Sequence, residues 1–139
     1  VGELVYKGKN VSLGYAECKE DLSKPDENKG MLITGDMAKR DDDGYYYIVG
    51  RKKRFIKIFG NRVNLDETER LLKNIVSDCA CVGDDDQMNI FICDKSRIDE
   101  VRSFISSKIG LHHSAFSVRF IDVIPKNTSG KTIYSSLIA

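Results

Sequence analysis

Short β-prone segments separated by turn residues fill the stretch 34–69, and this pattern most constrains the fold. The tyrosine-rich run YYYIVG at 45–50 follows the acidic turn DDDG at 41–44, and RFIKIF at 54–59 alternates charged with apolar side chains. Gly accepts positive φ, Asp bonds its own backbone, and a period of two is typical of a half-buried strand. The stretch therefore predicts a hairpin over 31–50 and a further strand after it.

Helical patterns enter only in the second half of the chain. Asn64 is a good N-cap, Ser96 is placed to cap a second helix, and Gly110 is placed to end it. The elements expected here are a helix over 64–74, strands at 79–82 and 89–93, a helix over 96–110, a strand at 118–124 and a short helix over 131–138.

These elements predict an α+β fold in two parts. Residues 51–139 read as a small domain with a three-stranded sheet packed by helices, because roughly ninety residues can bury a modest core. Residues 1–50 hold only two or three short strands, which cannot bury a core alone. We therefore expect 1–50 to be a short β remnant that packs against a larger body absent from this sequence.

Composition excludes several classes of protein. The 139 residues carry 22 cationic and 21 acidic side chains, a net charge of +1, so no overall field favours nucleic acid or an acidic membrane. The start VGELVYKGKN has no signal-peptide pattern, and no apolar run is long enough to span a membrane. We expect a cytoplasmic protein.

The metal-ligating residue types are not arranged as a ligand set. The four cysteines form no C-x-x-C pair, and His112 and His113 are adjacent, so we expect no metal site. Three of the cysteines lie in apolar runs and are expected to be free thiols in a reducing compartment, namely Cys79, Cys81 and Cys93.

Two motifs are ambiguous when taken alone. PKNTSGKT at 125–132 ends like a phosphate-binding P-loop, but Pro125 replaces the first glycine and the sequence stops eight residues after Lys131. Lys131 is then either a mobile cation that can reach a phosphate or carboxylate oxygen, or a solvated surface lysine. Asp36 either accepts hydrogen bonds from a ribose diol or caps a turn.

The basic run RKKRFIK at 51–57, with Arg62 nearby, also has two interpretations. Cations around an aromatic ring can bind nucleic acid, whereas lysines on an edge strand block aggregation. No second basic patch supports nucleic-acid binding.

Six motifs fall in order along the chain: TGD at 34–36, DxDGYYxIxGR at 41–51, IK at 56–57, GxRV at 60–63, ExE at 67–69 and PKxxSGK at 125–131. Together they resemble the C-terminal motifs of the adenylate-forming superfamily of acyl-CoA synthetases, aminoacyl-adenylating domains and luciferases. The resemblance covers essentially the whole chain. It implies a C-terminal fragment of an AMP-forming acid–thiol ligase, in which a mobile C-terminal domain turns about a hinge between carboxylate adenylation and thioester formation.

The resemblance assigns roles residue by residue. Asp36 matches the aspartate that holds the ribose hydroxyls, Arg51 the arginine that contacts the ribose region, and Lys131 the lysine that bridges the carboxylate and the α-phosphate. Lys53 matches the hinge, and the loop with Gly60 and Arg62 lies near the thiol tunnel in the second step.

The resemblance also implies ligands and partners outside these residues. The intact ligase would use ATP, Mg²⁺ and coenzyme A or a phosphopantetheine carrier, with a carboxylic acid as substrate. Its phosphate loop, acyl pocket and metal-binding glutamate belong to the missing N-terminal adenylation domain, so we expect the fragment alone to be inactive. A domain that loads a carrier protein, a basic nucleic-acid-binding module and a non-catalytic interaction domain remain the alternatives.

The family hinge is commonly aspartate and is Lys53 here, and lysine is also seen at that place in the family. Two further positions depart from the family pattern. The residue after the hinge is often acidic in the family and is Arg54 here, and the arginine that often lies three residues after the catalytic lysine is replaced by Tyr134.

Overall fold

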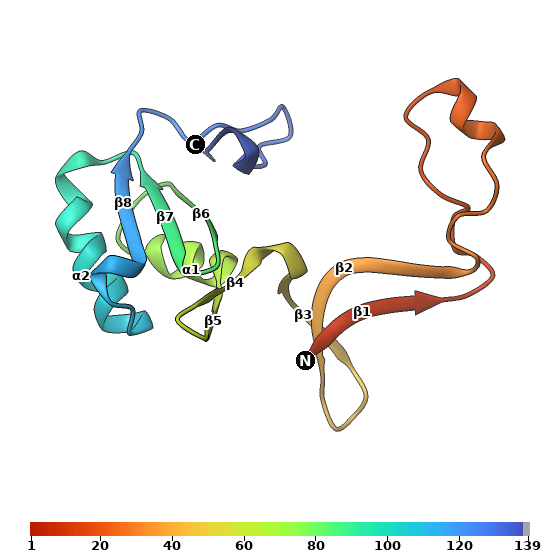
Figure 1. The fold of residues 1–139 in the computed structure, drawn as a ribbon, viewed down its shortest axis with the longest axis horizontal. Coiled ribbons are helices and arrows are strands. Elements are labelled where there is room, and N and C mark those ends of the chain that lie inside the picture. Colours follow the sequence, from red (N-terminus) through yellow and green to blue (C-terminus); the bar gives the residue numbers. More distant parts are fainter. Residues whose placement is uncertain (138–139) are drawn as a thin grey trace. The chain divides into compact units, whose positions relative to one another are not determined.

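The structure is a computed structural model that describes residues 1–137 (Figure 1). It divides into two compact units, Val1–Lys53 and Arg54–Ala139. Within the described residues, no helix is both long enough and apolar enough to cross a membrane.

The first unit is a three-stranded antiparallel sheet in the order β1-β2-β3, formed by β1 (Gly2–Lys7), β2 (Met31–Arg40) and β3 (Tyr46–Arg51). The hairpin expected over 31–50 is therefore present, and a short 3-10 helix at Lys19–Ser23 lies in the connection before it. Of residues 1–53, all of which are described, only Met37 and Ala38 are buried. This unit has almost no core of its own, in line with the expectation for so few strands.

The second unit begins with a hairpin of β4 (Phe55–Ile58) and β5 (Asn61–Asn64), which leads directly into α1 (Leu65–Leu72). Asn64 caps this helix as expected, since its side-chain oxygen accepts hydrogen bonds from the backbone of Asp66 and Glu67. The sequence analysis missed β5, because its four residues, NRVN, are mostly polar and carry no apolar alternation.

A three-stranded sheet in the order β6-β7-β8 forms the centre of the second unit. Its elements are β6 (Cys79–Asp84), β7 (Gln87–Ile92), α2 (Ile98–Ile109) and β8 (Phe116–Phe120), with β6 and β7 antiparallel and β7 and β8 parallel. This arrangement confirms the predicted α+β class and the three-stranded sheet.

Three predicted boundaries were wrong. Asp94, not Ser96, caps the turn before α2, because its carboxylate accepts a hydrogen bond from the Ser96 backbone. The last strand starts and ends earlier than 118–124. The helix expected over 131–138 is a 3-10 turn at Tyr134–Ser136, and Ile138 lies outside the described residues.

Both faces of the central sheet are covered, which explains why the run CACV in β6 is buried throughout. Cys79 and Cys81 join the main core with residues of α1 and α2, whereas Ala80 and Val82 join a second cluster on the other face. That second cluster includes residues from the C-terminal segment, namely Ile124, Leu137 and the partly buried Tyr134. The segment that carries Lys131 is thus packed against the sheet at both of its ends.

Candidate functional site

Asp36 and Arg51 are direct cross-strand partners in the first unit. An Asp36 carboxylate oxygen lies 2.8 Å from Arg51 Nη1. Asp36 does not cap a turn, because it lies inside β2, beside an irregularity in the β2–β3 register. Two residues that were assigned separately to the ribose region are therefore adjacent.

Thr34 fixes this pair and was not singled out from the sequence. Its hydroxyl donates to the Leu4 carbonyl at 2.8 Å and accepts from the Asp36 backbone at 3.1 Å. Its carbonyl accepts from Arg51 at 3.4 Å. Within residues 1–137, no partner contacts the second Asp36 carboxylate oxygen, which leaves an acceptor for a hydroxyl group.

Lys53 lies in a short 3-10 helix, Lys52–Arg54, with its side chain exposed. The boundary between the two compact units falls directly after it. This position suits a pivot, and the hinge role itself stays a prediction.

Lys131 lies in a tight loop that Asn127 organises. The Asn127 side-chain oxygen accepts hydrogen bonds from the Lys131 backbone at 2.9 Å and from the Ser129 backbone and hydroxyl at 3.0 and 2.8 Å. Asn127 also donates its backbone N–H to the Lys131 carbonyl, and a β-bridge between Lys126 and Thr132 closes the loop. The mobility expected for this loop stays a prediction. The hydrogen-bonded turn itself could have been predicted, because an Asn three residues before a Gly is a turn signal.

The two lysines of this loop have different surroundings. Lys126 forms an ion pair with Asp78, and this contact raises the pKa of the ammonium. Lys131 is exposed, and no ion pair within the described part of the chain involves its side chain. The loop therefore anchors one cation and presents the other to solvent.

The loop with Gly60 and Arg62 is the β4–β5 hairpin. Phe59 and Gly60 both have positive φ, 47° and 83°, as a two-residue type I′ turn requires. The backbone N–H of Phe59 donates to Asp86 at 2.7 Å, and that of Lys57 donates to Asp85 at 2.8 Å. Asp85 and Asp86, in the acidic turn between β6 and β7, therefore hold this hairpin.

Arg62 lies over the ring of Phe55, with its guanidinium carbon 4.0 Å from the ring centroid. The aromatic side chain of the basic run is therefore occupied by a cation of the same hairpin. A base could stack on this face of Phe55 only if Arg62 moved away, which weakens the nucleic-acid interpretation.

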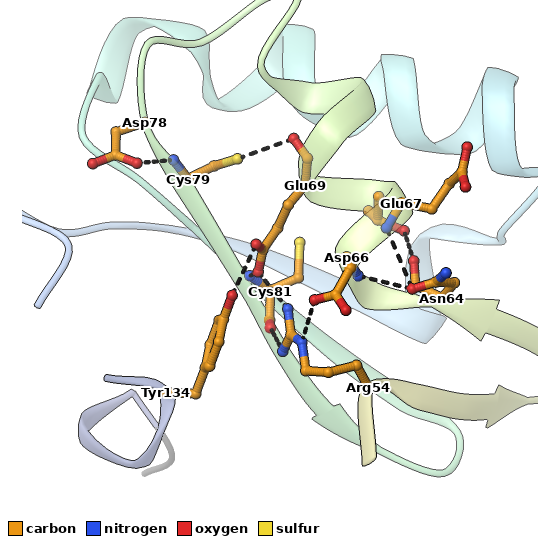
Figure 2. A network of polar contacts seen from close by, with 10 residues as sticks. Arg54, Asn64, Asp66, Glu67, Glu69, Asp78, Cys79, Cys81 and Tyr134 are labelled. Carbon is orange, nitrogen blue, oxygen red and sulfur yellow. Dashed lines mark hydrogen bonds and ion pairs between the residues drawn. The ribbon is translucent and has the colours of Figure 1, made fainter. Parts of the chain in front are cut away.

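A buried polar network follows the predicted hinge (Figure 2). Arg54 donates from Nε to Asp66 at 2.7 Å, from Nη2 to Glu69 at 2.6 Å and from Nη1 to the Cys81 carbonyl at 2.7 Å. Glu69 accepts from the Cys81 backbone N–H at 2.8 Å and from the Tyr134 hydroxyl at 3.0 Å. Since β6 is an edge strand, the backbone N–H and C=O of Cys81 have no strand partner on that side, and Glu69 and Arg54 satisfy them.

The charges in this network shift the pKa values of its members. Burial opposes ionisation of Arg54, but the hydrogen bond to Asp66 and the charge of Glu69 outweigh it, so the pKa of Arg54 is raised. Burial and then the charge of Glu69 raise the pKa of Tyr134 to about 12. Burial also raises the pKa of the Cys79 thiol to about 12. The native network thus holds a charged Arg54 and a neutral Tyr134.

The two candidate regions of the second unit lie apart. Figure 1 shows the β4–β5 hairpin at one end of this unit and the segment with Lys131 at the other. The two segments that carry the residues predicted for the two reaction steps therefore lie at different ends of one small domain.

Several known proteins are similar to this chain in sequence over nearly its whole length. The chain is 35% identical over 152 aligned residues to "4-coumarate--CoA ligase-like 8" of Arabidopsis thaliana, with 99% of this chain and 26% of that protein covered. It is 34% identical to "4-coumarate--CoA ligase 2" of Nicotiana tabacum, again with 99% of this chain and 28% of that protein covered. The chain thus spans about a quarter of the length of these curated relatives.

A solved structure agrees with this similarity. The o-succinylbenzoate coenzyme A synthetase from Bacillus subtilis in complex with AMP superposes with a TM-score of 0.69 at 22% identity, covering 98% of this chain and 30% of that structure. No protein-family model matches the chain. The relatives and the shared fold agree on one assignment: the chain belongs to the adenylate-forming enzymes and corresponds to their C-terminal region.

Proposed function

We propose that this chain is the hinge and mobile catalytic end of an AMP-forming acid–thiol ligase. The proposal rests on the environment of Lys131. Its ammonium is exposed and forms no ion pair within residues 1–137, and its loop is held by Asn127. Lys131 also matches the catalytic lysine of the family motif. In the first step ATP and a carboxylic acid give an acyl-adenylate and pyrophosphate. In the second a thiol takes the acyl group.

Each residue has a defined task in the first step. The Asp36 carboxylate accepts hydrogen bonds from the ribose hydroxyls, and Arg51 orients that carboxylate through their 2.8 Å contact. Lys131 supplies positive charge where negative charge develops between the carboxylate and the α-phosphate. Asp36 as acceptor and Arg51 as donor fit a nucleoside. The Mg²⁺ ligands are proposed to belong to the N-terminal adenylation domain.

For the second step we propose coenzyme A as the acceptor, since the named relatives are CoA ligases. Rotation about Lys53 would replace the Lys131 loop at the reaction centre by the hairpin with Gly60 and Arg62. The separation of the two regions within the second unit supports such an exchange of surfaces (Figure 1). Loading of a carrier-protein phosphopantetheine is the alternative acceptor chemistry.

The test uses the full-length ligase and follows both half-reactions. Lys131→Ala should lower pyrophosphate release on addition of ATP and acid by about 100-fold or more, and should leave thioester formation from a preformed adenylate nearly unchanged. Lys108→Ala, which removes another exposed lysine of the same unit, is the matched control and should leave both steps intact. If pyrophosphate release survives Lys131→Ala, the proposed role is wrong and a non-catalytic interaction domain is favoured.

The nucleic-acid alternative has its own test. If that alternative holds, charge reversal at Lys52 and Lys53 should abolish salt-dependent binding of an oligonucleotide. We expect the unaltered chain to show no such binding.

We also expect the 139-residue chain alone to catalyse neither half-reaction. The buried free thiols Cys79 and Cys81 support a reducing, cytoplasmic location.

A further inference from the structure

The two positions that depart from the family pattern, Arg54 and Tyr134, meet in the structure. The guanidinium carbon of Arg54 lies 3.8 Å from the centroid of the Tyr134 ring, within the range of a cation–π interaction. Figure 2 shows both side chains converging on Glu69 from different elements. An acid at position 54 and an arginine at position 134 would carry opposite charges in this geometry.

Tyr134 is well placed to hold the loop that precedes it. Its hydroxyl donates to Glu69 at 3.0 Å, and Glu69 is itself fixed by Arg54 and by the backbone N–H of Cys81. Only two residues separate Tyr134 from Lys131, and the backbone of the intervening Ile133 donates to the Pro125 carbonyl at 2.8 Å. Displacement of Tyr134 would therefore open the base of the loop.

The other side of the loop is held independently. Ile124 is buried in the cluster on the sheet, and Lys126 pairs with Asp78. Tyr134 therefore supplies the anchor on the C-terminal side, together with the buried Leu137. Without the Tyr134 anchor the C-terminal side would be held to the sheet only at Leu137, further from Lys131.

We propose that Tyr134 is a positioning residue for Lys131, and that Arg54, the residue directly after the proposed hinge, is the platform on which Tyr134 rests. This inference rests on the proposed function, because it concerns how Lys131 is held for the first step. It also implies that the position of the lysine loop depends on the residue that begins the mobile domain. No rigid link between the two units is needed, since every contact in the network lies within the second unit.

The first arm of the test measures backbone amide hydrogen exchange in the 139-residue chain. Tyr134→Leu should raise exchange at Lys131 and Ile133 by about 10-fold or more, because both amides are hydrogen-bonded within the loop, and should leave the amides of α2 unchanged. Tyr134→Phe keeps the ring on Arg54 and should give a smaller increase, and Ser135→Ala should give none. Unchanged exchange at Lys131 in both Tyr134 variants would overturn the inference, as would an equal increase across α2.

The second arm measures the half-reactions in the full-length ligase. Tyr134→Leu should lower kcat for adenylation by about 10-fold, with KM for ATP and thioester formation from a preformed adenylate both changed less than about twofold. If Tyr134→Leu keeps full adenylation activity while Lys131→Ala loses it, the positioning role of Tyr134 is wrong and the proposed function stands. Adenylation that survives Lys131→Ala would overturn both.

Discussion

Arg54 lies between two carboxylates and an aromatic ring, and its guanidinium carbon is 3.8 Å from the centroid of the Tyr134 ring. The Arg54 and Glu69 side chains are each only 12% exposed. A residue in the polar sequence RKKR is therefore part of the interior of the second unit.

Removal of the Arg54 charge should destabilise the second unit strongly. Arg54→Met leaves the Glu69 carboxylate and the Cys81 carbonyl without their guanidinium partner, and breaking a buried ion pair costs about 3 kcal/mol or more in the free energy of unfolding. Denaturant unfolding measures this loss. Arg70→Met, which breaks an exposed pair with Glu67, is the control and should cost about 0.5 kcal/mol or less. Similar losses in both variants would contradict the buried role of Arg54.

Tyr134→Arg should restore part of the stability that the second unit loses in Arg54→Glu. Arg54→Glu places a third acid beside Asp66 and Glu69 and should destabilise the unit, whereas addition of Tyr134→Arg restores a cation at the centre of the same network. A double-mutant cycle on the free energy of unfolding should give a favourable coupling of about 1 kcal/mol or more. Additive effects would show that the contact between these two positions has no energetic weight.

The stability of the second unit should depend on Tyr134 at alkaline pH. The pKa of Tyr134 is raised from its ordinary 10.0 to about 12, mainly by burial and by the charge of Glu69, with Arg54 opposing the shift. The folded state thus favours the neutral phenol, and this contribution is complete below pH 10.0 and is lost as the pH rises toward about 12. In Tyr134→Phe the free energy of unfolding should fall less steeply across this interval, as measured by denaturant unfolding at a series of pH values. Parallel curves for the two proteins would contradict this prediction.

Thiol reactivity should separate the cysteines into two classes. Cys18 is exposed, whereas burial raises the pKa of Cys79 to about 12 and that of Cys81 well above its ordinary value. A thiolate-directed alkylating reagent near neutral pH should therefore modify Cys18 at least about 100-fold faster than Cys79 or Cys81. Mass spectrometry of the labelled chain measures the rates, and unfolding in denaturant, which should equalise them, is the control. Rapid labelling of Cys81 in the native chain would show that the β6 edge opens.

The sequence determined the elements that depend on local patterns. The hairpin over 31–50, the Asn64 cap, the end of α2 at Gly110 and the strands of the central sheet follow from turn chemistry and periodicity, which act between neighbours along the chain. The ordered motifs also identified the family, which the relatives confirm.

Tertiary structure alone decided which residues work together. Asn127 and Asp86 are residue types that are common in turns. Asn127 nevertheless organises the Lys131 loop, and Asp86 holds the β4–β5 hairpin from another part of the chain. Arg54 and Tyr134 are eighty positions apart in the sequence and looked like two unrelated departures from a pattern. Their contact exists because α1 and the edge of β6 place Glu69 between them, and long-range packing of this kind leaves no periodic trace in a single sequence.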